Sequence, residues 1–133
     1  MEKDSLILII DDDSRNIFAL SLVLKARGFK CISALKVEDG LKLLEQNPDT
    51  SIILMDMMMP DIDGYEAIKL INSQQKHKKL PIIAVTAQAM QGDKERCLEA
   101  GAWGYISKPV DIDKLLAEMQ KVIINDRTKS YKG

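Results

Sequence analysis

The sequence has few cysteines, histidines and aromatic residues, and it lacks a long apolar run. Its two cysteines, Cys31 and Cys97, do not form a Cys-x-x-Cys motif, so we expect reduced thiols in the core and no disulfide bridge. The single histidine, His77, lies among lysines and glutamines, which argues against a Ser-His-Asp catalytic triad. No apolar stretch approaches the roughly 20 residues of a membrane span, and the N-terminal apolar run is too short for a signal peptide. These absences predict a cytoplasmic protein that makes no direct contact with a membrane.

An excess of charge of one sign is also missing. The chain has 19 basic and 20 acidic residues, and a formal net charge of -1 argues against direct binding of nucleic acid. A length of 133 residues suits one domain. We place that domain at residues 1–125 and expect residues 126–133, which lack apolar periodicity, to be a frayed tail or the stub of a linker.

Short apolar runs rich in branched residues alternate along the chain with segments of helical periodicity. The expected strands are residues 6–10, 29–34, 51–55, 81–85 and 103–106. The expected helices are residues 14–27, 37–46, 64–73, 91–100 and 111–124. Because crossover connections between parallel strands are almost always right-handed, this alternation predicts an α/β fold, a doubly wound parallel sheet of five strands with helices on both faces.

Polar residues follow four of the five apolar runs. They are Asp11 to Asp13 after the first run, Asp56 after the third, Thr86 after the fourth, and Ser107 and Lys108 after the fifth. In an open parallel sheet, the residues just past the carboxyl ends of the strands share one crevice, where ligands bind. Carboxylates, a hydroxyl and an ammonium that converge there suit a divalent cation and a phosphoryl group.

The three successive aspartates would repel one another unless something positive lies beside them. Either Asp13 or Ser14 is expected to cap the helix that follows, and this needs only one of the carboxylates. We therefore interpret Asp11 and Asp12 as metal ligands. A pair of hard oxygen donors with the remaining positions filled by water suits Mg²⁺.

Asp56 is an isolated charge within an apolar stretch, where burial would be costly without a partner. Beside a metal, its carboxylate can act as a nucleophile toward phosphorus and form an aspartyl phosphate, although a turn carboxylate at a strand end is the simpler alternative. The backbone carbonyl of Met58 lies where it could complete the metal shell. Asp61 and Asp63 are interpreted as turn and cap residues before the helix that begins at Gly64.

Thr86 and Lys108 acquire a role only through their positions at strand ends. The Thr86 hydroxyl can donate to a phosphoryl oxygen, and the Lys108 ammonium offers a point charge to the same oxygens. The residue after Lys108 is Pro109, which favours a cis peptide bond more than any other residue would.

Four motifs in this order resemble the response-regulator receiver domain, the phosphoacceptor module of two-component signalling. The resemblance covers about residues 5–125 and rests on residues 9–13, 54–64, 81–87 and 105–109 (IIDDD, LMDMMMPDIDG, PIIAVTA and YISKP). It implies a flavodoxin-like sheet with the strand order 2-1-3-4-5, an order that the spacing of the motifs does not itself supply.

The resemblance also implies a role for each matching residue. Asp56 would accept the phosphoryl group from a histidine kinase or a histidine phosphotransfer protein. Direct ligands of Mg²⁺, or of Mn²⁺ in its place, would be Asp12, Asp56 and the Met58 carbonyl, with Asp11 acting mainly through water. Thr86 and Lys108 would contact the phosphoryl oxygens.

Tyr105 takes the position of the aromatic switch of this family, which would turn inward when Thr86 moves toward the phosphoryl group. Asn16 and residues 88–92 look more like receivers fused to hybrid histidine kinases than like DNA-binding regulators. The apolar and charged mix of the last two helices would allow a phosphorylation-dependent homodimer.

Two other functions remain open at this point. The Asp-x-Asp opening at residues 11–13 fits a small phosphatase of the haloacid dehalogenase type, but the Gly-Thr that usually follows is missing and Asp56 would have no task. An interaction module that works without phosphorylation is the second alternative, and it is disfavoured because none of the key residues is missing.

Overall fold

The computed structural model describes residues 5–74, 80–87 and 91–132, with the side chains of the last helix described as far as Val122. The strands are β1 (Leu6–Ile10), β2 (Lys30–Ala34), β3 (Thr50–Asp56), β4 (Ile82–Thr86) and β5 (Gly104–Ser107). The helices are α1 (Ser14–Ala26), α2 (Val37–Gln46), α3 (Gly64–Ser73), α4 (Asp93–Ala100) and α5 (Ile112–Lys132). The alternation of strands and helices is the one that the sequence predicts.

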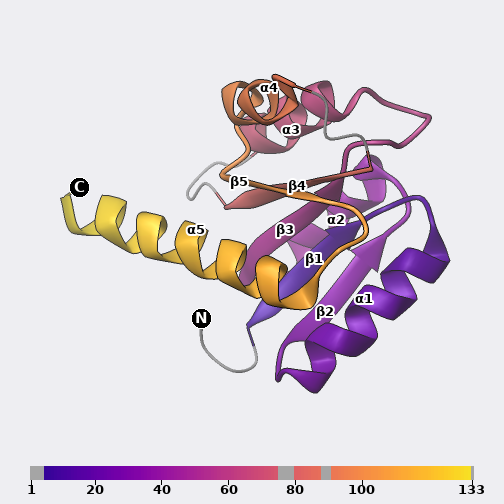
Figure 1. Cartoon of the computed structure of the whole chain (residues 1–133), viewed down its shortest axis with the longest axis horizontal. Helices are drawn as coiled ribbons and strands as arrows, with labels where there is room; N and C mark the ends of the chain where they lie inside the picture. The colour runs from indigo at the N-terminus through magenta and orange to yellow at the C-terminus, as the bar shows by residue number, and fades with distance from the viewer. Residues whose placement is uncertain (1–4, 75–79, 88–90, 133) are drawn as a thin grey trace.

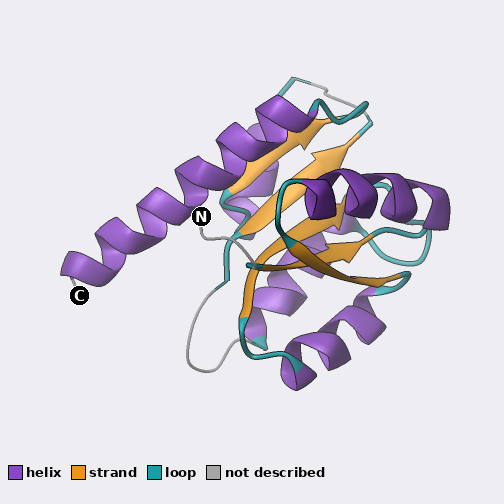
Figure 2. Cartoon of the chain, turned by 90° about the horizontal axis from the view of Figure 1, so that it is seen from below, coloured by secondary structure: helices purple, strands orange, loops and turns teal. Residues whose placement is uncertain are grey.

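The five strands form one sheet (Figure 2), and all of them are parallel, in the order β2-β1-β3-β4-β5. Ile10 of β1 pairs with Met55 of β3, Met55 pairs with Ala84 of β4, and Ala84 pairs with Tyr105 of β5. The fold class and the strand order implied by the resemblance are therefore confirmed. β1 and β3 lie side by side at the centre, and their carboxyl ends define the middle of the crevice.

Helices cover both faces of the sheet, with α1 and α5 on one side and α2, α3 and α4 on the other (Figure 1). Alternate residues of the central strands belong to the core layers on opposite faces of the sheet, because successive side chains of a strand point to opposite faces. The layer with α2 to α4 contains Leu8, Ile10, Ile53 and Met55. The layer with α1 and α5 contains Ile7, Ile9, Ile52 and Leu54.

The end of α5 corrects one prediction from the sequence. The helix continues to Lys132, beyond the end predicted at residue 124 (Figure 1). The division into a domain at residues 1–125 and a frayed tail or linker stub at residues 126–133 stays a prediction. Packing holds the first half of α5 against the sheet through Leu115, Met119 and Val122, which are almost fully buried. Beyond that point no proline or glycine occurs before Gly133, so nothing in the chain stops the helix.

Several local predictions are confirmed. Asp13 caps α1 and Asp63 caps α3, each accepting a hydrogen bond from the backbone two residues later. The Lys108–Pro109 peptide bond is cis. Cys31 and Cys97 are both free thiols.

In the described ranges, none of the helices combines the length and the apolar character needed to cross a membrane.

Candidate functional site

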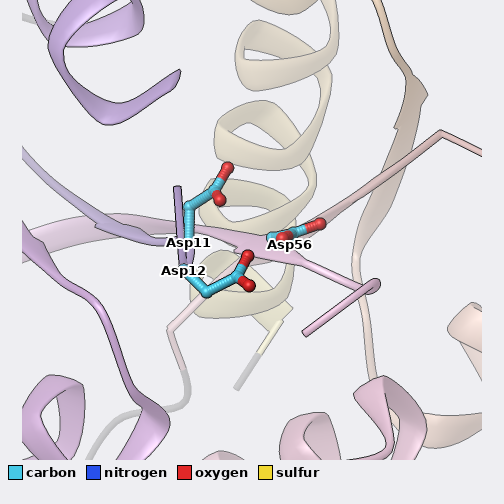
Figure 3. Close-up of side chains that lie close together, drawn as sticks. All are labelled: Asp11, Asp12 and Asp56. Atoms are coloured by element: carbon cyan, nitrogen blue, oxygen red, sulfur yellow. The ribbon is translucent and has the colours of Figure 1, made fainter. Parts of the chain in front are cut away.

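Three aspartates meet at the carboxyl ends of β1 and β3. Asp11 and Asp12 follow β1, and Asp56 is the last residue of β3 (Figure 3). Each contributes a carboxylate oxygen, and these oxygens all lie within 4.8 Å of one another. Ile10 pairs with Met55. The residues that follow them, Asp11 and Asp56, therefore lie next to each other at the carboxyl ends of β1 and β3. Sequence-distant carboxylates are thus brought together by the register of two adjacent parallel strands.

Two of these carboxylates are buried. The exposed fractions of Asp11 and Asp56 are 7% and 3%, whereas Asp12 is exposed. Backbone N–H groups satisfy part of their hydrogen-bonding capacity: Asp13 N donates to Asp11 Oδ1 at 2.9 Å, and Met58 N donates to Asp56 Oδ1 at 3.1 Å. Neutral donors offset only part of the cost of burying two like charges, so a cation is needed beside them.

Lys108 supplies one positive charge. Its Nζ lies 3.4 Å from Asp56 Oδ1 and 3.5 Å from Asp11 Oδ2. The backbone of the same residue donates to the carbonyl of Thr86 at 2.7 Å, which holds the start of the loop after β5 against the end of β4. One ammonium between three carboxylates leaves a net negative charge, so the site can still accept a divalent cation.

The environment of Asp56 disfavours its charged form. Burial is the largest influence and raises the pKa of Asp56 above its ordinary value, and the negative charge of Asp11 acts in the same direction. The Met58 N–H and the Lys108 ammonium oppose this shift without cancelling it. Without a bound cation, the ionised Asp56 carboxylate is therefore a destabilised group in a polar pocket.

Thr86 and Tyr105 lie on neighbouring strands at the edge of the same site. Thr86 ends β4 with an exposed fraction of 2%, and it pairs with Ser107 of β5. Tyr105 lies two residues before Ser107, is half-buried, and packs against the core layer of α2 to α4. Its phenol donates a hydrogen bond to Asp93 Oδ2 at 3.0 Å.

A cavity of about 550 Å³ opens beside the carboxylates. Asp11, Asp56 and Lys108 form its polar part, and apolar side chains of the sheet, α1 and the start of α5 form the rest. Asn16, on the first turn of α1, also lines it. This space leaves Asp56 accessible from the side of α1.

The donor set fits a small divalent cation. Oxygen-only donors, two of them on consecutive residues of one loop, suit Mg²⁺ or Mn²⁺ and do not suit metals that prefer sulfur or imidazole. Direct coordination by the Met58 carbonyl stays a prediction; the structure places the N–H of Met58 against Asp56. Among the residues marked by the resemblance, 88–90 lie outside the described residues.

Some contacts at the site were not predicted from the sequence. The pairing of Lys108 with Asp11 was missed because Lys108 was assigned only to phosphoryl oxygens. Asp93, which binds Tyr105, was missed because an acidic residue in the first turn of a helix is common for electrostatic reasons alone. Asn16 could have been found from its position one helical turn after Asp12, on the side of α1 nearest the crevice.

Comparisons with known proteins agree with this geometry. A family profile described as the response regulator receiver domain matches residues 7–120. The polar-differentiation response regulator DivK of Brucella ovis is 31% identical over 121 residues, which cover 88% of this chain and 94% of DivK.

Two solved structures show the same arrangement of elements. A putative response regulator from Chloroflexus aurantiacus is 31% identical with a TM-score of 0.82, over 92% of this chain and 99% of that one. The CheX–CheY–BeF3–Mg²⁺ complex from Borrelia burgdorferi contains a chain that is 26% identical with a TM-score of 0.82, over 91% of this chain and 90% of that one.

Proposed function

The chain belongs to the response-regulator receiver family, and from this premise we propose that Asp56 accepts the phosphoryl group in a two-component phosphorelay. One observation carries the assignment to Asp56. Its carboxylate is the more deeply buried of the two buried members of the cluster, and it lies within reach of both aspartates after β1 and of the Lys108 ammonium. The cavity beside Asp11 and Asp56 leaves this carboxylate open to a donor.

In the transfer, an Asp56 carboxylate oxygen forms a bond to phosphorus while the bond from phosphorus to the leaving group breaks. With a phosphohistidine donor, the leaving group is the imidazole nitrogen, which takes up a proton. Lys108, 3.4 Å from Asp56 Oδ1, is placed to neutralise charge that spreads over the phosphoryl oxygens. The Thr86 hydroxyl donates to one of those oxygens once the phosphoryl group is in place.

Mg²⁺, with Mn²⁺ as a substitute, is the proposed metal. Asp12, Asp56 and the Met58 carbonyl would hold it directly and Asp11 mainly through water. A bound Mg²⁺ would neutralise the negative charge of the carboxylates and of the incoming phosphoryl group. The Borrelia burgdorferi complex contains CheX, CheY, BeF3 and Mg²⁺, which supports this choice.

The consequence of phosphorylation is proposed to be a change of surface. Thr86 moves toward the phosphoryl group and vacates space, and Tyr105 turns inward beside it. Because Tyr105 lies on β5 and contacts α4 through Asp93, the face formed by α4, β5 and α5 would change its affinity for a partner.

The proposed donor is a histidine kinase or a histidine phosphotransfer protein, and the proposed location is the cytoplasm. The face formed by α4, β5 and α5 could also support a phosphorylation-dependent homodimer. We propose that the chain assists its own phosphorylation and dephosphorylation without turning over a separate substrate. Neither the haloacid dehalogenase phosphatase nor the phosphorylation-independent module is favoured once the family is established.

The test is the incorporation of label from radioactive acetyl phosphate in the presence of Mg²⁺. We expect at most one label per chain, loss of labelling with chelator, and no labelling of Asp56→Asn. Asp13→Asn is the matched control, because Asp13 caps α1 and lies outside the carboxylate cluster, and asparagine is an equally good cap. This control should label like the parent.

Undiminished labelling of Asp56→Asn would refute the assignment. Repeated turnover of a small phosphate monoester, with no label retained on the chain, would instead support the phosphatase. Labelling that is independent of Mg²⁺ and Mn²⁺ would refute the proposed metal site while leaving the phosphoacceptor in place.

A further inference from the structure

A single carboxylate, that of Asp93, joins two tyrosines from different elements. Asp93 is the first residue of α4, and its Oδ1 accepts a hydrogen bond from the hydroxyl of Tyr65 on α3. Its Oδ2 accepts a hydrogen bond from the hydroxyl of Tyr105 on β5 at 3.0 Å. The guanidinium carbon of Arg96 lies 4.1 Å from the centroid of the Tyr65 ring. These contacts tie α3, α4 and β5 together at one point.

Both phenols are held as hydrogen-bond donors. The hydrogen bond to Asp93 is the largest influence on Tyr65 and raises its pKa to about 12. Burial is the largest influence on Tyr105, followed by its own hydrogen bond to Asp93, and together they raise its pKa to about 12 as well. Asp93 is half-buried and lies in the first turn of α4, a position that acidic side chains commonly occupy. Charge-assisted hydrogen bonds of this kind are stronger than neutral ones.

This network lies next to the phosphoryl site. A cavity of about 300 Å³ is lined both by residues of the network, Asp93, Arg96 and Tyr65, and by Thr86, Met57 and Met58. Met58 also donates its N–H to Asp56, and Thr86 is the residue proposed to move. The Tyr105 hydroxyl is therefore anchored across a small space from the residues that sense the phosphoryl group.

We propose that Asp93 is the positioning residue for Tyr105, holding the tyrosine in the position observed here until phosphorylation draws Thr86 away. The inference rests on the proposed function and adds to it the specific contact that must break. Tyr65 keeps its own hydrogen bond to Asp93, so the carboxylate stays in place and can take Tyr105 back when the phosphoryl group is lost. Because an inward turn of Tyr105 would break its hydrogen bond to Asp93, this hydrogen bond opposes activation, and its removal favours the activated state.

The test measures the affinity for beryllofluoride, a phosphoryl analogue, at saturating Mg²⁺ in the full chain. The variants are Asp93→Ala, Tyr105→Phe and the double variant, with Tyr65→Phe as the matched control. Tyr65→Phe removes the same hydroxyl from the same carboxylate but leaves the Asp93–Tyr105 hydrogen bond. Ring resonances of ¹³C-labelled tyrosine, of which the chain has three, report the environment of Tyr105.

Both Asp93→Ala and Tyr105→Phe should bind beryllofluoride about fivefold to tenfold more tightly than the parent, because the arrangement observed without a phosphoryl group loses the Asp93–Tyr105 hydrogen bond. The double variant should gain no more than either single variant, since both single variants remove the same Asp93–Tyr105 hydrogen bond. Tyr65→Phe should bind like the parent. In Asp93→Ala without beryllofluoride, the Tyr105 ring signal should shift toward its position in the bound parent.

A role of Asp93 in stability alone would lower the melting temperature and leave beryllofluoride affinity and the Tyr105 signal unchanged, which would refute the proposal. If Asp93→Ala does not fold, an unchanged affinity of Tyr105→Phe refutes it equally. Failure of the parent itself to bind beryllofluoride would refute the proposed phosphoacceptor function, so the two failures are distinguishable.

Discussion

Replacing Asp56 by asparagine is expected to stabilise the metal-free protein. The substitution keeps the size of the side chain and removes one negative charge from a site where two buried carboxylates face one ammonium. An amide oxygen can still accept the hydrogen bond from Met58 N. Lys108 keeps its contact with Asp11, so no cation is left unpaired.

The magnitude follows from the distances. Carboxylate oxygens of Asp11 and Asp56 within 4.8 Å of one another repel by at least about 3.5 kcal/mol at an effective dielectric constant of about 20. At the same dielectric constant, Lys108 at 3.4 Å attracts Asp56 by about 5 kcal/mol. The two terms nearly offset each other, and the remaining cost of burying the Asp56 charge decides the sign.

The raised pKa of Asp56 shows that the ionised carboxylate costs more in the folded chain than in the unfolded one. We expect a gain on the order of 1 kcal/mol for Asp56→Asn at pH 7, the size that a single stabilising substitution commonly gives. For a chain of this length, that gain corresponds to a rise of about 3–5 °C in the melting temperature.

The assay is thermal unfolding in chelator as a function of pH. Because the folded pKa of Asp56 is raised, ionisation of this one carboxyl does not lower the stability of the parent below the ordinary aspartate value of 3.8. The destabilisation that Asp56 causes develops as the pH rises through the folded value. Asp56→Asn lacks this loss, so the two curves should meet at low pH and separate as the pH rises. Asp49→Asn is the matched control, because Asp49 is an exposed carboxylate before β3, at the opposite end of that strand, and should change stability little.

Mg²⁺ should reverse the order of the two proteins. A ligand that binds only the folded state stabilises it by about 1.4 kcal/mol at tenfold its dissociation constant, and Asp56→Asn loses a charged ligand and so gains less. A melting temperature of Asp56→Asn in chelator that is equal to or below that of the parent at neutral pH would refute the reasoning. The electrostatic account of the cluster would then be wrong.

Three further substitutions test other parts of the site. Lys108→Met should slow labelling of Asp56 by acetyl phosphate about 100-fold while the far-ultraviolet circular dichroism stays unchanged, because the ammonium beside the phosphoryl oxygens is lost; an unchanged rate would contradict its role. Thr86→Ala should still be labelled but should lose the shift of the Tyr105 ring signal on binding beryllofluoride, and a full shift would exclude Thr86 from the switch. Met58→Asn should lose its label several-fold faster than the parent, because an apolar Met58 cannot orient a water by hydrogen bonding; equal decay in a time course would refute this.

Much of the fold could be predicted from the sequence because the signals are local. Branched apolar runs and helical periodicity define the five strands and five helices to within one or two residues at nearly every boundary. The end of α5 is the exception, since a helix can continue through residues that show no apolar periodicity. The strand order came from the resemblance, because spacing alone does not decide which parallel strands are neighbours.

By itself, the sequence determined which side chains stand at the carboxyl ends of the strands, and in a parallel sheet these ends share one edge. That rule brings Asp11, Asp12, Asp56 and Lys108 together without any knowledge of packing. Only the tertiary structure decided that Lys108 bridges Asp11 and Asp56, and that Asp93 binds Tyr65 and Tyr105. Such contacts depend on where a helix lies over a sheet and on side-chain rotamers, and no periodicity along the chain records either of them.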